Sequence, residues 1–191
     1  MSLVNYYLPT TLNVAGVERA IRSDYRSGLD ICIAMQDEEL KDYDKVAVIL
    51  DILYIDTLEP EVYTEALSQA LGFLACGSSD GQTEKKASKT ADLIFWQADF
   101  DIFIPSLNRV AGSDIRGMDY LHWWSFVGLF QEMGDCFFSR VMAIRDARAT
   151  GRKLTDDEKA FWKKHKDVID PKLKQLRAQD LDLMREMQII Q

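Results

Sequence analysis

The amino-acid sequence predicts a mainly α-helical protein, a compact helical domain of about seven or eight helices with a short N-terminal β-hairpin. Apolar residues recur at spacings of three and four along most of the chain, which is the period of a helix with one buried face. The composition, 47% hydrophobic and 28% charged, is typical of a domain with a packed core. We expect residues 1–168 to form this domain and residues 169–191 to form an appended C-terminal helix.

The first elements are indicated by turn and capping residues. Residues 8–21 alternate in part between apolar and polar side chains around Gly16, which predicts the β-hairpin. Ser23 and Asp24 then offer the N-cap of a first helix, which we expect to end at the acidic segment 36–39.

Two further helices are expected before a loop. One, of about three turns, starts at Asp42 or Tyr43. The other follows Pro60 and ends at Gly77, because glycine is the usual residue just beyond a helix C-terminus. Residues 77–86 contain no large apolar side chain and predict a mobile loop.

Proline and aromatic residues divide the second half of the chain. A helix over residues 91–103 is expected to end before Pro105, because proline lacks the amide hydrogen that a helix interior uses. The most aromatic segment, residues 120–130, predicts a buried central helix capped by Asp119. A further helix is expected after a break at Gly134.

The helices nearest the C-terminus carry most of the basic residues. The helix after Gly134 turns basic from Arg145 onward. Thr155 has the features of a helix start, since acids fill the first turn after it, and Phe161 and Trp162 are the apolar contacts of that helix.

The sequence contains no targeting signal, and its cysteines do not form a recognisable motif. No stretch approaches the ~20 apolar residues of a membrane-spanning helix, and the first residues lack the layout of a signal peptide. We therefore expect a cytoplasmic protein that does not contact the membrane. Cys32, Cys76 and Cys136 are widely separated, so we interpret them as small buried residues rather than as a disulfide framework or a metal site.

Charge is unevenly distributed, although the net charge is -8. Residues 1–139 hold 10 Lys and Arg against 22 Asp and Glu, whereas residues 140–177 hold 12 against 6. We interpret the basic segment first as a solvated helical face. A self-complementary contact is the second interpretation, and nucleic-acid binding through Arg148, Arg152 and Lys153 is the third. The acidic remainder of the chain would repel phosphates, which argues against nucleic acid.

The residues that usually carry chemistry are not arranged in a recognisable motif. His122 and His165 lie outside any zinc-binding pattern, and we interpret His122, beside two tryptophans, as a core histidine. We interpret Asp92, Asp99 and Asp101 as solvated surface. The sequence therefore predicts no catalytic residue, no cofactor site and no metal site, and we expect a protein that is not an enzyme.

Large apolar side chains are the candidate partner-docking residues. Trp123 and Trp124 are adjacent on the predicted aromatic helix and point about 100° apart, so both are buried only if that helix is broadly enclosed. Burial of both is favoured, and the alternative is that one of them, with Tyr120, faces a partner. Met184 and Met187 are either packing residues or an adaptable docking face.

Seven segments of the chain carry a family resemblance. They are residues 8–9, 15–18, 23–26, 35–40, 91–94, 119–126 and 138–145. Read in order, they resemble the bacteriophage gene-product-fifteen family of tail-region proteins over roughly residues 8–166, and the Tyr-Leu-His-Trp-Trp run at 120–124 is the most specific part. The connection at 102–116, the stretch at 145–151 and the last helix depart from the family pattern.

The resemblance implies a role in phage tails. Members of this family look like products of genes between those of the major tail protein and the tape-measure protein, where long-tailed phages encode tail-assembly chaperones. The resemblance therefore implies a chaperone that binds the tape-measure protein or other tail proteins during tail morphogenesis. A structural tail or connector component, present in the virion as a homo-oligomer, is the alternative.

Overall fold

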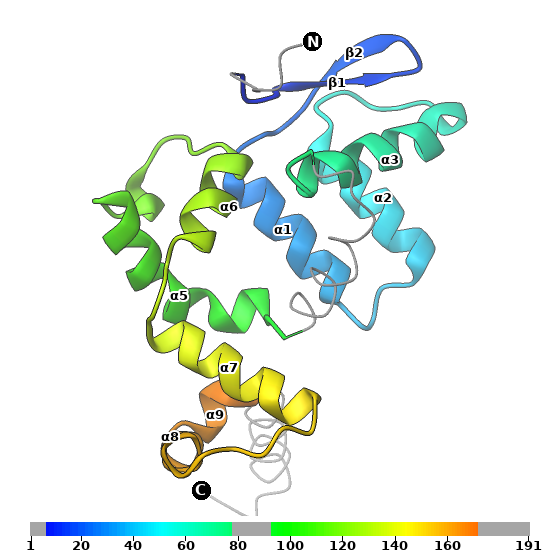
Figure 1. The fold of residues 1–191 in the computed structure, drawn as a ribbon. Helices are drawn as coiled ribbons and strands as arrows, with labels where there is room; N and C mark the ends of the chain where they lie inside the picture. Colours follow the sequence, from blue (N-terminus) through cyan, green and yellow to red (C-terminus); the bar gives the residue numbers. More distant parts are fainter. Residues whose placement is uncertain (1–6, 78–92, 172–191) are drawn as a thin grey trace, which may run out of the picture. The chain divides into compact units, whose positions relative to one another are not determined.

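The computed structural model describes residues 7–77 and 93–171 (Figure 1). Within these ranges it contains eight α-helices, two short 3-10 helices and a two-stranded antiparallel sheet near the N-terminus. The predicted fold class, mainly α with a short hairpin, is confirmed. The predicted loop after Gly77 and the predicted C-terminal helix, with Met184 and Met187, lie outside the described residues.

The chain divides into two compact units. Of the described residues, 7–77 and 104–133 form the first unit, and 93–103 and 134–171 form the second. The predicted division between a domain ending at residue 168 and an appended helix stays a prediction.

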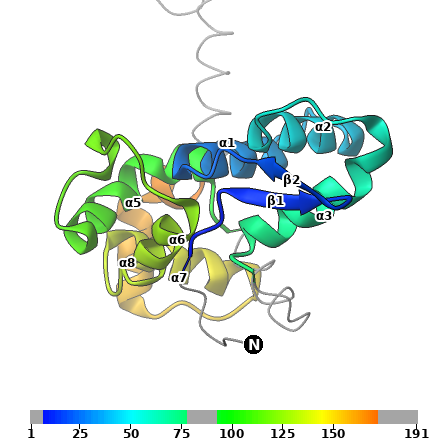
Figure 2. The same ribbon diagram turned by 90° about the horizontal axis from the view of Figure 1, so that it is seen from above.

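The N-terminal hairpin of the first unit forms where it was predicted. Strands β1 (Thr11–Val14) and β2 (Val17–Ala20) pair with Val14 opposite Val17. The turn residues Ala15 and Gly16 both have positive φ, 52° and 79°, as a tight two-residue hairpin turn requires. Strand β1 contacts helix α3, and the hairpin lies over that helix in Figure 2.

Three helices build the core of the first unit together with α6. They are α1 (Tyr25–Gln36), α2 (Asp42–Leu53) and α3 (Tyr63–Leu74), the last preceded by a 3-10 turn over Pro60–Val62. Helix α1 packs on α2 and α6, and α2 packs on α3. All three predicted helices are confirmed. The predicted end of α3 near Gly77 is confirmed, but the C-cap is Ala75 rather than the glycine. Gly77 lies two residues beyond Ala75 with a φ of 73°, and its amide donates to the carbonyl of Gly72 over 2.9 Å.

Helix α5 (Trp96–Ala111) corrects one prediction. We expected a helix over residues 91–103 that ended before Pro105, but the helix begins at Trp96 and continues through the proline. An interior proline costs about 3 kcal/mol. Burial of Ile104 and Leu107, each worth about 1.5–3 kcal/mol, offsets that cost, because Pro105 itself lies on the exposed side.

Helix α6 (Trp123–Gln131) corrects a second prediction. The expected cap, Asp119, does not start this helix. The amide of Tyr25 donates to the carbonyl of Leu121, and the amide of Trp123 donates to the carbonyl of Ser23, both over 2.8 Å. This antiparallel pairing keeps the chain extended through residue 122, so the helix begins only after it.

The second unit contains α7 (Phe137–Ala149), α8 (Asp156–Lys164) and α9 (Lys166–Ile169). Thr155 is the N-cap of α8, as predicted, and forms a capping box with Glu158. Helix α7 has an unpredicted N-cap in Cys136. The core of this unit consists of Val141, Ile144 and Ile169, with Ile102, Leu154, Phe161, Trp162 and Val168 packed against them. The predicted apolar contacts Phe161 and Trp162 are thus confirmed.

Candidate functional site

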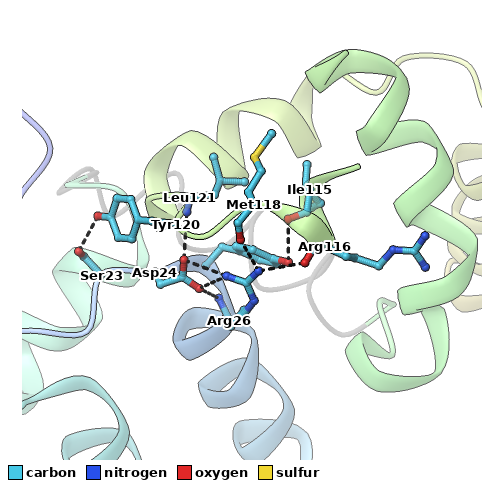
Figure 3. A network of polar contacts seen from close by, with 9 residues as sticks. Ser23, Asp24, Arg26, Ile115, Arg116, Met118, Tyr120 and Leu121 are labelled. Carbon is cyan, nitrogen blue, oxygen red and sulfur yellow. Dashed lines mark hydrogen bonds and ion pairs between the residues drawn. The ribbon is translucent and has the colours of Figure 1, made fainter. Parts of the chain in front are cut away.

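Two segments of the first unit that contain both polar and aromatic residues meet at the N-terminal ends of α1 and α6 (Figure 3). They are residues 23–26 and 119–126, and both belong to the segments on which the family resemblance rests. The Asp24–His122 bridge joins their backbones. We call this region the α1–α6 junction.

Asp24 organises the α1–α6 junction. Its carboxylate accepts hydrogen bonds from the amides of Arg26 and Leu121, both over 3.0 Å, so it caps α1 and holds the other segment at the same time. The guanidinium of Arg26 forms an ion pair with the same carboxylate and donates to the carbonyl of Met118 over 2.7 Å, as Figure 3 shows. These contacts hold in place the segment that precedes α6.

His122 is a core histidine, as the sequence predicted. It is only 2% exposed, and its Nδ1 accepts from the amide of Trp124 over 3.0 Å, so it is the N-cap of α6. Its Nε2 lies 2.9 Å from the carbonyl oxygen of Pro9. An acceptor at Nδ1 requires a hydrogen at Nε2, which then donates to Pro9.

Both tryptophans of the predicted docking set are bound within the first unit. Trp123 is buried, and its indole nitrogen donates to the carbonyl of Leu74 over 3.0 Å. Trp124 is half-buried, and its indole nitrogen donates to the carbonyl of Phe73 over 2.8 Å. The two rings therefore attach the start of α6 to the end of α3.

Tyr120, the third predicted docking residue, is the most accessible of them. Its side chain is 53% exposed, and its hydroxyl lies 2.8 Å from that of Ser23 (Figure 3). The α1–α6 junction thus uses nearly every polar group that it contains to hold the fold, and leaves one tyrosine ring partly open to solvent.

A pocket of about 420 Å³ lies elsewhere in the first unit, at the C-terminal end of α2. Its apolar floor contains Leu50, Tyr54 and Leu58, which are buried. Ile55, 53% exposed, stands at its edge. The remaining lining residues are Arg22, Ala47, Val48, Asp51, Asp56, Thr57 and Tyr63. We call this the α2 pocket.

The walls of the α2 pocket are held by hydrogen bonds. One nitrogen of the Arg22 guanidinium, Nη1, donates to the carbonyls of Asp51, Ile52 and Tyr54 over 2.8, 3.0 and 2.6 Å. These are carbonyls at a helix C-terminus, where a positive charge is favourable. The amide of Ile55 donates to the carbonyl of Ala20. The pocket is therefore preformed.

Tyr54 anchors the floor of the α2 pocket. Its hydroxyl donates to the carbonyl of Ala66 over 2.9 Å, which joins α2 to α3. Burial, assisted by the negative charge of Glu65, raises the pKa of Tyr54 to about 12. Tyr54 is thus a neutral hydrogen-bond donor throughout the physiological pH range.

The model of the family described as bacteriophage Gp15 protein matches residues 4–170. The chain belongs to this family. It is therefore a bacteriophage protein, and the resemblance predicted from the sequence is confirmed. Neither the curated proteins nor the solved structures gave a match.

In this Gp15 family member, the segments that carry the resemblance are mainly structural. Residues 23–26 and 119–126 bind each other at the α1–α6 junction, and residues 15–18 contain the hairpin turn. Segment 138–145 belongs to α7, which carries the central cation of the second unit.

That cation corrects one prediction and is an exception to another. We interpreted Asp99 as solvated surface, but its side chain is only 1% exposed. We interpreted residues 140–177 as a solvated helical face, and Arg145 of that segment is instead buried, with its side chain 4% exposed, in a bidentate ion pair with Asp99. The two nitrogen–oxygen distances are 2.5 and 2.9 Å. Both groups are buried because each satisfies the charge of the other.

Arg145 also holds backbone from two other parts of the second unit, the residues before α5 and helix α9. It donates to the carbonyls of Leu93, Val168 and Ile169 over 2.8, 2.7 and 2.8 Å. Asp99 in turn accepts from the amide of Phe95 over 2.8 Å at the start of α5. This hub lies within the second unit and gives a structural role to one of the 12 basic residues of segment 140–177.

The basic residues that suggested nucleic-acid binding are partly paired with acids. Arg148 lies 3.5 Å from Asp170, and Arg152 lies 2.7 Å from Glu158. Within the described ranges, no group of three His, Cys, Asp or Glu residues is arranged to hold a metal ion. No helix of the described ranges has the length and apolar character needed to cross a membrane.

The three cysteines are less completely buried than we predicted. We expected three buried residues, but Cys32, Cys76 and Cys136 are each intermediate in exposure, and none of the three forms a disulfide. Burial raises the pKa of Cys32 to about 12 and that of Cys76 to about 11. Cys136 caps α7 through Sγ, which accepts from the amide of Ser139 over 3.3 Å. Ser139, three residues after Cys136, completes a capping box with it. That spacing was the sequence signal that could have indicated the start of α7.

Proposed function

We propose that this phage protein is a tail-assembly chaperone that binds the tape-measure protein through the α2 pocket, and that it acts by binding rather than by catalysis. The observation that carries the proposal is the preformed apolar floor of the pocket, with a half-exposed isoleucine at its edge. Membership of the Gp15 family supports a phage partner, and the tail-region character implied by the resemblance supports a tail protein.

The α2 pocket has the size and chemistry to accept apolar side chains of a helix. Its volume of about 420 Å³ falls within the range of roughly 300–1,000 Å³ that is common for binding pockets. An amphipathic helix binds such a site by inserting apolar residues spaced three or four apart. A long helical protein that exposes these residues before assembly would otherwise self-associate.

The charges at the rim favour a helix with basic residues beside its apolar stripe. Asp51 and Asp56 line the pocket and are exposed. The cation of Arg22 is already engaged by three carbonyls of the pocket wall. A lysine or arginine on the bound helix would therefore meet acids at the rim, which increases the association rate more than the final affinity.

The experiment is co-expression of the chain with the tape-measure protein of its own genome, followed by affinity capture. Ile55→Asp places a charge at the pocket edge, and Val17→Asp is the matched control, because both residues are β-branched and similarly exposed, at 53% and 49%. We expect the wild type and Val17→Asp to capture soluble tape measure. Ile55→Asp should weaken capture by about tenfold or more, because an anchor worth about 1.5–3 kcal/mol is lost.

The outcomes separate the chaperone from the structural alternative. A chaperone keeps the tape measure soluble and is absent from purified virions. Equal capture by both variants would remove the α2 pocket from the account. No capture by the wild type, with the chain present in virions, would overturn the chaperone function and favour a structural tail or connector component.

A further inference from the structure

Two surface patches of opposite charge, one on each unit, have the same design. Each combines at least one exposed large apolar side chain with exposed ionised residues of the same part of the fold. Neither patch includes residues of the α2 pocket, so the inference drawn from them is independent of the proposed function.

The acidic patch lies at the connection between α1 and α2. Met35 and Tyr43 are 43% and 77% exposed, and Asp37, Asp42 and Asp44 around them are all exposed. Two lysines accompany these acids in sequence, Lys41 and Lys45, and Lys45 donates to the carbonyl of Met35 over 2.8 Å. Exposed tyrosine and methionine side chains are enriched where proteins bind one another.

The basic patch lies in the second unit, where α7 begins and α8 ends. The Phe137 ring is 38% exposed and contacts the rings of Phe161 and His165, with centroids 5.5 and 5.1 Å away. The guanidinium of Arg140 lies over the Phe161 ring at 4.3 Å and remains exposed. Lys164, also exposed, precedes His165 in the chain.

We propose that the acidic patch of one copy of this chain binds the basic patch of a second copy. The two patches match in kind, since Tyr43 and Met35 can cover Phe137 while Asp42 and Asp44 face Arg140 and Lys164. The division of charge along the sequence supports this pairing, with 22 acids against 10 bases in residues 1–139 and 12 bases against 6 acids in residues 140–177.

The proposed contact joins two different surfaces and is therefore heterologous. Contacts of this type generate a ring if the rotation between copies closes, and an open chain of copies if it does not. The assembly should grow with protein concentration. It should also weaken with salt, because raising the ionic strength from about 0.1 M to about 1 M shortens the screening length from about 10 Å to about 3 Å.

The test is sedimentation velocity on the full chain and on two charge-reversed forms. The first form carries Asp42→Arg with Asp44→Arg, and the second carries Arg140→Glu with Lys164→Glu. Each form alone has two patches of like charge, so self-association should weaken by at least about tenfold. Mixing the two forms restores opposite charges at every contact and should restore assembly, which also shows that both forms are folded.

A matched control carries the same charge change elsewhere on the first unit. Glu59→Arg with Glu61→Arg alters two exposed acids, one at the start of the 3-10 turn and one within it, and should assemble as the wild type does. Tyr43→Ser should reduce assembly without changing charge. A wild-type chain that stays monomeric at high concentration would overturn the proposal. So would reversed forms that assemble alone as the wild type does, or a mixture that does not assemble.

Discussion

Replacing Arg145 by methionine should unfold the second unit more readily than any exposed charge change. The substitution keeps an unbranched apolar stem but removes the cation that faces the buried Asp99. It also leaves the carbonyls of Leu93, Val168 and Ile169 without this donor. Removing one partner of a buried ion pair costs about 3–5 kcal/mol, which is a large part of the roughly 5–15 kcal/mol that stabilises a typical domain.

Urea denaturation followed by circular dichroism measures this loss. Arg152→Met is the matched control, because Arg152 forms its ion pair with Glu158 at the surface, where such pairs contribute little. The double variant Asp99→Asn with Arg145→Met should lose less than the sum of the two single variants, since no unpaired charge is buried. The reasoning would be refuted if Arg145→Met and Arg152→Met unfolded at the same urea concentration.

Three further predictions follow from other contacts. Gly28→Ala should cost about 1–3 kcal/mol in a thermal melt, because the added Cβ would overlap the buried Trp123 ring, whereas Gly72→Ala, with open space around its Cβ, should be neutral or stabilising. Cys32 and Cys76 should react slowly with a thiol reagent at about pH 8 until the chain is denatured, because burial raises the pKa of both; fast labelling of the native protein would contradict this. The carboxyl of Glu158 has its pKa lowered from 4.5 to about 2, first by the hydrogen bond from Arg152 and then by that from the Thr155 amide. Its stabilisation of α8 should therefore be complete above pH 4.5 and be lost as the pH falls towards 2, and Glu158→Gln should remove this pH dependence from an acid titration followed by circular dichroism.

Local sequence signals were sufficient for much of the first unit. Glycine at the hairpin turn, Asp24 at the start of α1 and Gly77 after α3 each satisfy backbone groups within a few residues of themselves. Such contacts can be read from spacing alone, because the two partners are neighbours in the chain.

The errors occurred where distant residues decide the local structure. Asp99 and Arg145 are 46 positions apart, so neither position alone indicates burial. The start of α6 is set by hydrogen bonds to Ser23 and Tyr25, about a hundred positions earlier, and not by Asp119, the cap that we expected. Burial on the opposite face keeps α5 intact through Pro105, against the local preference.

At the candidate site, too, local patterns were informative and long-range contacts were not predicted. The tryptophans were the natural anchors in the sequence, but both indole nitrogens donate to carbonyls at the end of α3. The α2 pocket depends on Arg22, which follows the hairpin, and on the residues between α2 and α3. Ile55, in a short polar connection after an amphipathic helix, was the one signal of an exposed apolar side chain there.

Site-specific photo-crosslinking tests the central claim most directly. A photoreactive amino acid at Ala47, an exposed helical residue that lines the α2 pocket, is compared with the same group at Ala160, an exposed helical residue of α8. With the tape-measure protein of the same genome co-expressed, the account predicts a crosslink from position 47, mapped by mass spectrometry to an apolar stripe of a tape-measure helix, and none from position 160. Crosslinks of equal yield from both positions, or none from position 47 while the two proteins copurify, would contradict it.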